Sequence, residues 1–384
     1  MSQRAIAIIG TGMMGAAHLR ASRLAGARLQ GVLGSSPQRS REVAEQWGAA
    51  RAYESLEALV NDPAVDVVHI CSPNAAHFAA AEAALLAGKH VVCEKPLATT
   101  LADAQRLSRL AAERGLVATI PFVYRYHPMV REARALVLQG ELGPLQLIHG
   151  SYLQDWLLSP TDSNWRVDAA KGGASRAFAD IGSHWCDLVE WITGERFESV
   201  VADLRTTIKD RPTESRQSFT AAQASGADVA MGAVNTEDVA GALLRTTSGT
   251  LATVTISQVS AGRKNRLWFE IDGAKGSLVY DQESPEQLWV GRRGSFELRV
   301  KDPSQGSAEQ RRLAKAPAGH SQGYADCFEA FVGDTYATID GEVREGLPTF
   351  ADGYRSAHIV DAVLRSAASA SWTPIDPATT EGPN

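Results

Sequence analysis

The stretch from Ala5 to Gly15, AIAIIGTGMMG, decides the fold of this chain of 384 residues. Its first five residues are apolar without interruption, which is typical of a parallel strand that is buried on both faces. The glycines of a G-x-G-x-x-G motif follow at once, and residues 16–25 then form a predicted helix. A glycine motif between a strand and a helix predicts a loop that binds a dinucleotide pyrophosphate at the helix N-terminus. The alternative is a glycine-rich turn that binds nothing.

Each glycine of this loop has a distinct expected part in cofactor binding. Gly10 makes the tight turn, Gly12 lets the pyrophosphate approach the backbone, and Gly15 lets the helix pack closely against the strand. We therefore assign the whole loop to the cofactor: Gly10, Thr11, Gly12, Met13, Met14 and Gly15.

Strands and helices are predicted to alternate from this motif as far as Ile120, which indicates a doubly wound parallel sheet of the α/β class. The expected strands are 29–33, 65–71, 90–93 and 116–120. The expected helices are one that ends at Trp47, followed by 56–61, 75–87 and 101–114. In such sheets, ligands bind in the crevice beyond the carboxyl ends of the strands.

The end of the second strand bears on the choice between NAD and NADP. A carboxylate about 20 residues beyond the glycines usually holds the adenosine ribose diol. This chain has Gly34-Ser35-Ser36 there, with Arg39 shortly after. Hydroxyl donors and an arginine suit a 2′-phosphate, so Ser35, Ser36 and Arg39 favour NADP, although NAD remains an alternative. The same serines can also cap the next helix, and the two roles are compatible.

Two further loops are expected at the carboxyl ends of strands. Glu94, Lys95 and Pro96 follow the strand 90–93, where a lysine can donate hydrogen bonds to a substrate and the proline fixes the turn that presents it. The alternative is a solvated strand exit followed by a turn. The strand 65–71 leads into another short polar loop, whose expected cofactor contacts are Cys71, Ser72, Pro73, Asn74 and His77.

The pattern changes after Pro121. The dense aromatic and basic stretch 122–128 precedes a predicted helix, 129–139, and strands then dominate. They are 145–153, 197–208, 237–247, 250–260, 266–272, 277–281, 286–291 and 295–300. We predict one large, open and mostly antiparallel sheet with one free face, surface loops over 209–235 and 301–319, and closing helices over 324–333 and 350–368. The expected domains are 1–122, which binds the dinucleotide, and 123–384, which binds substrate and forms oligomers.

One predicted helix, which begins at Phe178 and ends before Gly194, interrupts these strands. Asp180 and His184 are spaced i, i+4, and Asp187 follows three residues later, so all three side chains can share a face. A carboxylate beside an imidazole can orient it and raise its basicity, which suits a general base. The alternative is an amphipathic helix with a buried core histidine.

Composition excludes several functional classes. The net charge of −6 provides no basic surface for nucleic acid or for a membrane. The four cysteines form no C-x-x-C pair, which is typical of reduced thiols in the cytoplasm. No signal peptide and no membrane span are expected. No group of histidines, cysteines and carboxylates has the spacing of metal ligands, so we expect no metal.

With the glycine motif, Glu94-Lys95-Pro96 and Asp180-x-x-x-His184 in this order, the sequence resembles the Gfo/Idh/MocA family of NAD(P)-dependent sugar and polyol oxidoreductases. The resemblance implies an N-terminal Rossmann domain and a C-terminal α+β domain, whose open sheet is often buried in a homodimer or homotetramer. It implies that Lys95 contacts nicotinamide and substrate, and that His184 is the acid/base with Asp180 beside it. It also places Trp165 and Arg166 near the cofactor.

The expected reaction is hydride transfer between nicotinamide and a secondary alcohol or ketone of a sugar, polyol or glycoside. One alternative is a redox-neutral enzyme with tightly bound NADP, which carries out transhydrogenation or glycoside cleavage. Another is a nucleotide-binding sensor without turnover. The predicted catalytic residues are Lys95, Asp180 and His184. The candidate substrate contacts, which also include these three residues, are Tyr124, Arg125, Tyr152, Asp155, Trp156, Asn164, Asp187 and His320.

Overall fold

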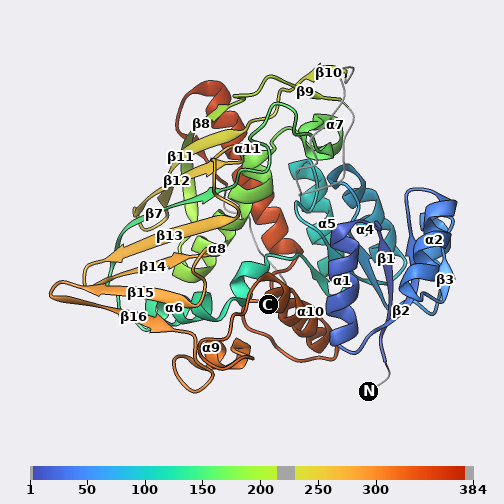
Figure 1. The fold of residues 1–384 in the computed structure, drawn as a ribbon, viewed down its shortest axis with the longest axis horizontal. Coiled ribbons are helices and arrows are strands. Elements are labelled where there is room, and N and C mark those ends of the chain that lie inside the picture. The colour runs from blue at the N-terminus through green and yellow to red at the C-terminus, as the bar shows by residue number, and fades with distance from the viewer. Residues whose placement is uncertain (1–2, 214–229, 377–384) are drawn as a thin grey trace. The chain divides into compact units, whose positions relative to one another are not determined.

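The computed structural model describes residues 3–213 and 230–376, which form two compact units (Figure 1). The first unit comprises the chain up to Val123 together with Tyr324–Ala357. The second comprises the described residues from Tyr124 to Gly323, together with the chain from His358. The long C-terminal helix α11 (Phe350–Ser369) therefore contributes to both units.

The first unit is built on a six-stranded parallel sheet with the order β3-β2-β1-β4-β5-β6. The strands are β1 (Ala5–Ile9), β2 (Arg28–Leu33), β3 (Arg51–Ala52), β4 (Val67–Ile70), β5 (His90–Cys93) and β6 (Ala118–Thr119). The order reverses between β1 and β4, and a doubly wound sheet binds its ligand at such a point. All five residues of β1 are buried, as its apolar sequence predicts. The predicted Rossmann sheet is confirmed.

Helices connect the strands of this first sheet. They are α1 (Met13–Leu24), α2 (Pro37–Trp47), α3 (Leu56–Val60), the 3-10 turn η1 (Asn74–Ala76), α4 (His77–Leu86) and α5 (Leu101–Arg114). Helix α10 (Tyr324–Ile339) returns from the far end of the chain and packs against α1. It is longer than the predicted 324–333, because Thr335 and Tyr336 continue its buried face beyond Gly333.

The second unit contains a nine-stranded sheet with the order β16-β15-β14-β13-β7-β12-β11-β8-β17. Only β7 and β12 pair in parallel, so the prediction of a mostly antiparallel sheet is confirmed. The strands are β7 (Leu145–Leu153), β8 (Phe197–Arg205), β11 (Val239–Thr246), β12 (Leu251–Ser257), β13 (Arg266–Gly273), β14 (Ser277–Asp281), β15 (Gln287–Arg292), β16 (Ser295–Val300) and β17 (Thr373–Pro374).

Helices α6 (Pro128–Leu138), α8 (Ser183–Thr193) and α11 lie along one face of this sheet (Figure 1). Residues from the sheet and from these helices form one core, in which Trp185 of α8 is completely buried and Phe269 of β13 points inward. Along β13, buried residues alternate with half-buried ones, such as Trp268 and Glu270. The half-buried residues define the second face of the sheet, which we call the open face.

Two predicted surface loops contain regular structure. Residues 209–235 include the short strands β9 (Asp210–Pro212) and β10 (Met231–Ala233), while residues 214–229 lie outside the described part. Residues 301–319 include helix α9 (Ala308–Leu313), which packs on α6. Long-range contacts stabilise both segments: Arg211 of β9 is buried and pairs with Asp238 at 3.0 Å, and Ser307 at the start of α9 donates its N–H to Glu132.

The predicted helix from Phe178 to Gly194 begins as a π-helical turn, η4 (Phe178–Gly182), and continues as α8. A π turn widens the helix locally and often marks a functional site. Gly194 ends the helix in the left-handed conformation, as predicted. Three shorter turns complete the second unit: η2 (Val123–Tyr126), η3 (Trp165–Val167) and α7 (Ala169–Gly172).

All four cysteines are free thiols. None of the helices within residues 3–213 and 230–376 combines the length and the hydropathy that a membrane span requires.

Candidate active site

The glycine loop between β1 and α1 has the geometry of a pyrophosphate site. Gly10 has φ +94°, and a Cβ there would lie 2.5 Å from the carbonyl group of Cys71 at the end of β4. A Cβ on Gly15 would overlap the carbonyl oxygen of Gly10, so both positions require glycine for close backbone packing. Gly12, by contrast, has nothing within 4 Å of the position of a Cβ, and it caps α1 without a side-chain hydrogen bond. This open backbone at a helix N-terminus fits a pyrophosphate.

The loop after β2 places a cation beside the glycine motif. Ser36 caps α2, because its Oγ accepts a hydrogen bond from the N–H of Arg39 at 3.1 Å, so the capping interpretation is correct. The Arg39 side chain also donates to Thr11 Oγ1 at 3.4 Å. A Cβ on Gly34 would lie 3.0 Å from both the Arg39 side chain and the backbone nitrogen of Ser40, which leaves little room for a carboxylate there.

A buried chain of hydrogen bonds extends from Glu94, the neighbour of Lys95. Glu94 Oε1 lies 3.0 Å from His18 Nε2, and the Nδ1 atoms of His18 and His69 are 2.8 Å apart. His69 Nε2 lies 2.9 Å from the hydroxyl of Tyr336, which donates to Ser22 at 2.8 Å. The chain links β5, α1, β4 and α10 through five buried side chains of the first unit.

Burial and neighbouring groups shift the pKa values of three residues in this hydrogen-bond network. Burial raises the pKa of Glu94, but the hydrogen bond from His18 and the charges of His18 and Lys95 outweigh it, so the pKa is lowered. The ionised carboxylate can only accept, so His18 Nε2 donates to it. Burial, together with the charge of His18, lowers the pKa of His69 well below its usual range, and burial raises the pKa of Tyr336. The second carboxylate oxygen of Glu94 accepts the backbone N–H of Lys95 at 3.2 Å, which ties the chain to the lysine.

His77 joins two of the predicted cofactor loops. Its ring nitrogens lie 2.7 Å from the carbonyl oxygen of Pro96 and 2.9 Å from that of Ser72. The ring therefore holds the turn after Lys95 against the loop after β4. This contact is structural, and it helps to position the neighbouring Lys95.

In the second unit, Asp180 lies in a polar environment formed by residues that are distant in the sequence. Its Oδ1 lies 3.3 Å from Arg166 Nε, and its Oδ2 accepts a hydrogen bond from Gln258 Nε2 at 2.9 Å. Asp180 is 9% exposed, and Gln258 is fully buried. Both oxygens of the carboxylate are therefore oriented by donors. The guanidinium of Arg166 also lies over the Trp165 ring, with its Cζ atom 4.4 Å from the ring centroid.

The imidazole of His184 lies among aromatic rings. Its centroid is 5.0 Å from that of Tyr124 and 6.4 Å from that of Tyr152, and it is 8% exposed. The two tyrosine hydroxyls are 2.7 Å apart, and Asn265 contacts both: its Oδ1 accepts from Tyr152 at 2.7 Å and its Nδ2 donates to Tyr124 at 3.2 Å. The second unit thus brings together His184, Tyr124 and Tyr152 from the predicted site.

The other predicted substrate contacts form ion pairs or hydrogen bonds with protein groups. Arg125 and Asp187 form a buried ion pair through two hydrogen bonds, one of 2.9 Å, which orients both side chains. Their role as sugar contacts stays a prediction. Asp155 pairs with Lys264 at 2.7 Å. The hydrogen-bond partners of the remaining three are Gln154 for the Trp156 indole, the N–H of Arg166 for Asn164, and the Ala318 carbonyl for the exposed His320.

Sequence reasoning did not identify His18, His69, Tyr336, Gln258 or Asn265. The position of His18 could have been predicted, because it follows Gly15 by three residues and so lies on the same side of α1. Tyr336 had none, since it meets His69 from a position 267 residues away. Gln258 and Asn265 lie at a strand end and in the turn that follows, where the sequence pattern says nothing about side-chain direction.

Comparisons with known proteins agree with this geometry. Residues 4–122 match the model of an oxidoreductase family with an NAD-binding Rossmann fold, and residues 130–279 match the GFO/IDH/MocA C-terminal domain. Levoglucosan dehydrogenase of Pseudarthrobacter phenanthrenivorans is 32% identical over 350 residues, which is 89% of this chain and 88% of the relative. A crystal structure of an oxidoreductase domain protein from Kribbella flavida superimposes with a TM-score of 0.87 at 33% identity, covering 98% and 100% of the two chains. Levoglucosan dehydrogenase in complex with NADH and L-sorbose also gives 0.87, at 28% identity and the same coverage.

The fold and the glycine loop define a nicotinamide-dependent oxidoreductase. The chain belongs to the Gfo/Idh/MocA family of such enzymes.

We expect Glu94→Gln to reduce stability at neutral pH, because the ionised hydrogen bond with His18 becomes a neutral one. The loss should be about 1–2 kcal/mol at pH 7 by urea unfolding. A carboxyl group whose pKa is lowered by folding stabilises above its ordinary value of 4.5, and this contribution disappears as the pH falls through the folded value. The difference between wild type and variant should therefore shrink below about pH 4.5.

Glu45→Gln, at an exposed position of α2, is the matched control and should change little at either pH. An equal deficit of Glu94→Gln at pH 7 and in acid would show that the ionised carboxylate is not the source of the stabilisation.

Proposed function

We propose that Lys95, His184 and Asp180 perform the proton and charge chemistry of a sugar or polyol dehydrogenase. In the direction of oxidation, His184 removes the proton of a secondary hydroxyl. The ammonium of Lys95 donates a hydrogen bond to the same oxygen and stabilises its developing negative charge. The nicotinamide cofactor, when bound, supplies the hydride chemistry. The observation that carries this proposal is the oriented carboxylate of Asp180, one helical turn before an imidazole enclosed by tyrosines.

Asp180 would act with its two donors rather than alone. Arg166 and Gln258 fix the direction of the carboxylate through an ion pair and a hydrogen bond. A fixed anion beside His184 favours the imidazolium that forms when the hydroxyl proton is taken up. Tyr124 and Tyr152 are among the sugar contacts that we propose, because aromatic rings with a polar tip suit the mixed faces of a sugar ring.

A sugar, polyol or anhydrosugar is the substrate class that we propose. Support comes from relatives named levoglucosan dehydrogenase and, at 27% identity over 93% of this chain, glucose-6-phosphate 3-dehydrogenase of Bacillus subtilis. The redox-neutral and sensor alternatives are not favoured, since these relatives are named as dehydrogenases. Oxidation of a secondary alcohol is therefore the reaction to test.

The test is reduction of NADP⁺ and NAD⁺, followed by nicotinamide absorbance, with a panel of aldoses, inositols and anhydrosugars. We expect one sugar class to support turnover. Lys95→Ala should lower kcat about 100-fold or more while cofactor binding is retained, because the lost donor acts on the reacting oxygen.

Lys275→Ala is the control, because Lys275 is an exposed lysine of the second unit beside Gly143 and should leave kcat unchanged. Full turnover by Lys95→Ala would refute the proposed mechanism. Failure of every substrate, with cofactor still bound, would instead favour the cycling or sensor alternative.

NADP is the cofactor form that we propose, on the evidence of Arg39 beside Thr11 and the crowded, uncharged position 34. This would distinguish the chain from levoglucosan dehydrogenase, whose solved complexes contain NADH. Ser35 and Ser36 would supply hydroxyl donors to the 2′-phosphate.

Arg39→Ala should weaken NADP⁺ binding about 10-fold or more and leave NAD⁺ binding nearly unchanged, as measured by fluorescence titration, because a charge-assisted contact to phosphate is lost. Arg41→Ala, on the exposed side of the same helix, is the control. Equal weakening of both cofactors by Arg39→Ala would assign the arginine to the pyrophosphate or to the loop itself.

A homodimer or homotetramer formed through the open face is the assembly that we propose, and we propose the cytoplasm as its location. Phe296 is 66% exposed and Leu298 55%, and the pairing of β16 with β15 and β14 places both on the open face. Burial of such side chains in a partner is favourable.

Sedimentation velocity at micromolar concentration should show an oligomer. The double variant Phe296→Glu/Leu298→Glu should shift it to monomer, since buried unpaired charges oppose association. A wild-type monomer would refute this assembly.

A further inference from the structure

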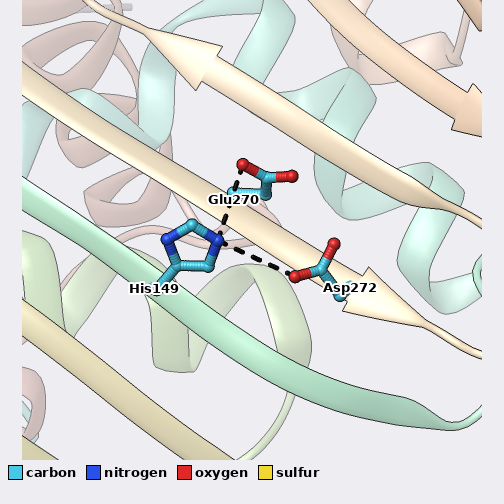
Figure 2. A group of neighbouring side chains, drawn as sticks. All are labelled: His149, Glu270 and Asp272. Carbon is cyan, nitrogen blue, oxygen red and sulfur yellow. Dashed lines mark ion pairs between the residues drawn. The ribbon is translucent and has the colours of Figure 1, made fainter.

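Three potential metal ligands meet on the open face, where sequence spacing had indicated none. His149 lies on β7, and Glu270 and Asp272 lie two residues apart on the adjacent strand β13 (Figure 2). His149 is the direct cross-strand partner of Glu270. The side chains are half-buried, with exposed fractions of 33%, 27% and 25% respectively. The register of two strands distant in sequence creates this group, so no local motif could predict it.

The separations of the ligand atoms fit a transition-metal ion. His149 Nε2 lies 3.5 Å from Glu270 Oε2 and 3.8 Å from Asp272 Oδ2, and all three atoms lie within 4.8 Å of one another. Tetrahedral ligands at about 2.1 Å from zinc are about 3.4 Å apart, so two of the three separations require only small side-chain movements. The three side chains point toward one another from the same face of the sheet (Figure 2).

The charge of the group also calls for a cation. Among the described residues, Glu270 and Asp272 have no ion-pair partner other than His149. The two carboxylates lie on the same half-buried face and repel each other, and a bound cation would offset this repulsion. The hydroxyl of Ser277 donates to Asp272 Oδ1, so the other oxygen, Oδ2, remains directed toward His149. A hydrogen bond to the second oxygen is the usual outer support of a ligating carboxylate.

We propose that His149, Glu270 and Asp272 bind a first-row divalent cation such as Zn²⁺, with water completing the coordination. An imidazole nitrogen with two carboxylate oxygens suits zinc and its neighbours in the first row, whereas calcium and magnesium prefer oxygen ligands alone. The ion would join the central strands β7 and β13 and stabilise the folded chain by mass action. The site lies on the open face, whereas His184 lies on α8 along the other face of the sheet, and the proposal does not depend on the proposed reaction.

The test is calorimetric titration of ZnCl₂ into the full-length protein after treatment with a chelator. We expect one high-affinity ion per chain and a rise in melting temperature of about 2 °C or more in saturating zinc. His149→Ala and Glu270→Gln should each weaken binding at least about 10-fold. Asp203→Asn, which removes an exposed carboxylate from β8 of the same sheet, is the control and should bind as wild type does.

Two results would overturn the proposal. One is the absence of zinc binding to the wild-type protein at micromolar concentration. The other is unchanged affinity in both site variants, which would place the ion at another group such as a thiol. Circular dichroism checks that the variants fold, and the nearly isosteric Glu270→Gln decides the question if His149→Ala does not.

Discussion

The burial of the Glu94 carboxylate is the constraint on which the arrangement of the first unit depends. Moving an ionised carboxylate out of water costs several kcal/mol, and only well-placed hydrogen bonds offset the cost. The structure supplies one from His18, which continues through His69 and Tyr336 to Ser22, on helices α1 and α10 and strand β4. These hydrogen bonds can form only when helix α10 packs against α1. The C-terminal part of the sequence therefore contributes directly to the position of Lys95.

Ion pairs and hydrogen bonds also offset the cost of burying charged groups in the second unit. Asp238 lies between the guanidinium groups of Arg176 and Arg211 and accepts three further hydrogen bonds from Thr207 and Ile208. Arg211 in turn donates to three backbone carbonyls in the segment that precedes η3. Asp180, closer to the predicted chemistry, is held by Arg166 and Gln258. A carboxylate with fixed donors keeps its position and direction without reorganisation, which is the condition for electrostatic catalysis.

The open face of the second sheet has the opposite character. It carries exposed apolar side chains, and among the described residues its two carboxylates, Glu270 and Asp272, share His149 as their ion-pair partner. We propose two partners for this face. A second copy of the chain would bury the exposed apolar side chains, and a divalent cation would offset the negative charge of the carboxylates. His184, the acid/base that we propose, lies on α8 along the other face of this sheet, so assembly and reaction can be tested independently.

The sequence by itself determined the parallel sheet, the glycine loop and the positions of Lys95 and His184, because these depend on local patterns: an apolar run, a glycine spacing and a helical spacing. It also indicated the mostly antiparallel sheet through the alternation of strands such as β13. Only the tertiary structure decided which side chains meet. Tyr336 reaches His69 across 267 positions, Arg125 forms an ion pair with Asp187, and His149 faces Glu270 through strand register. Such contacts depend on the packing of elements far apart in the chain, and no local pattern of residues encodes that packing.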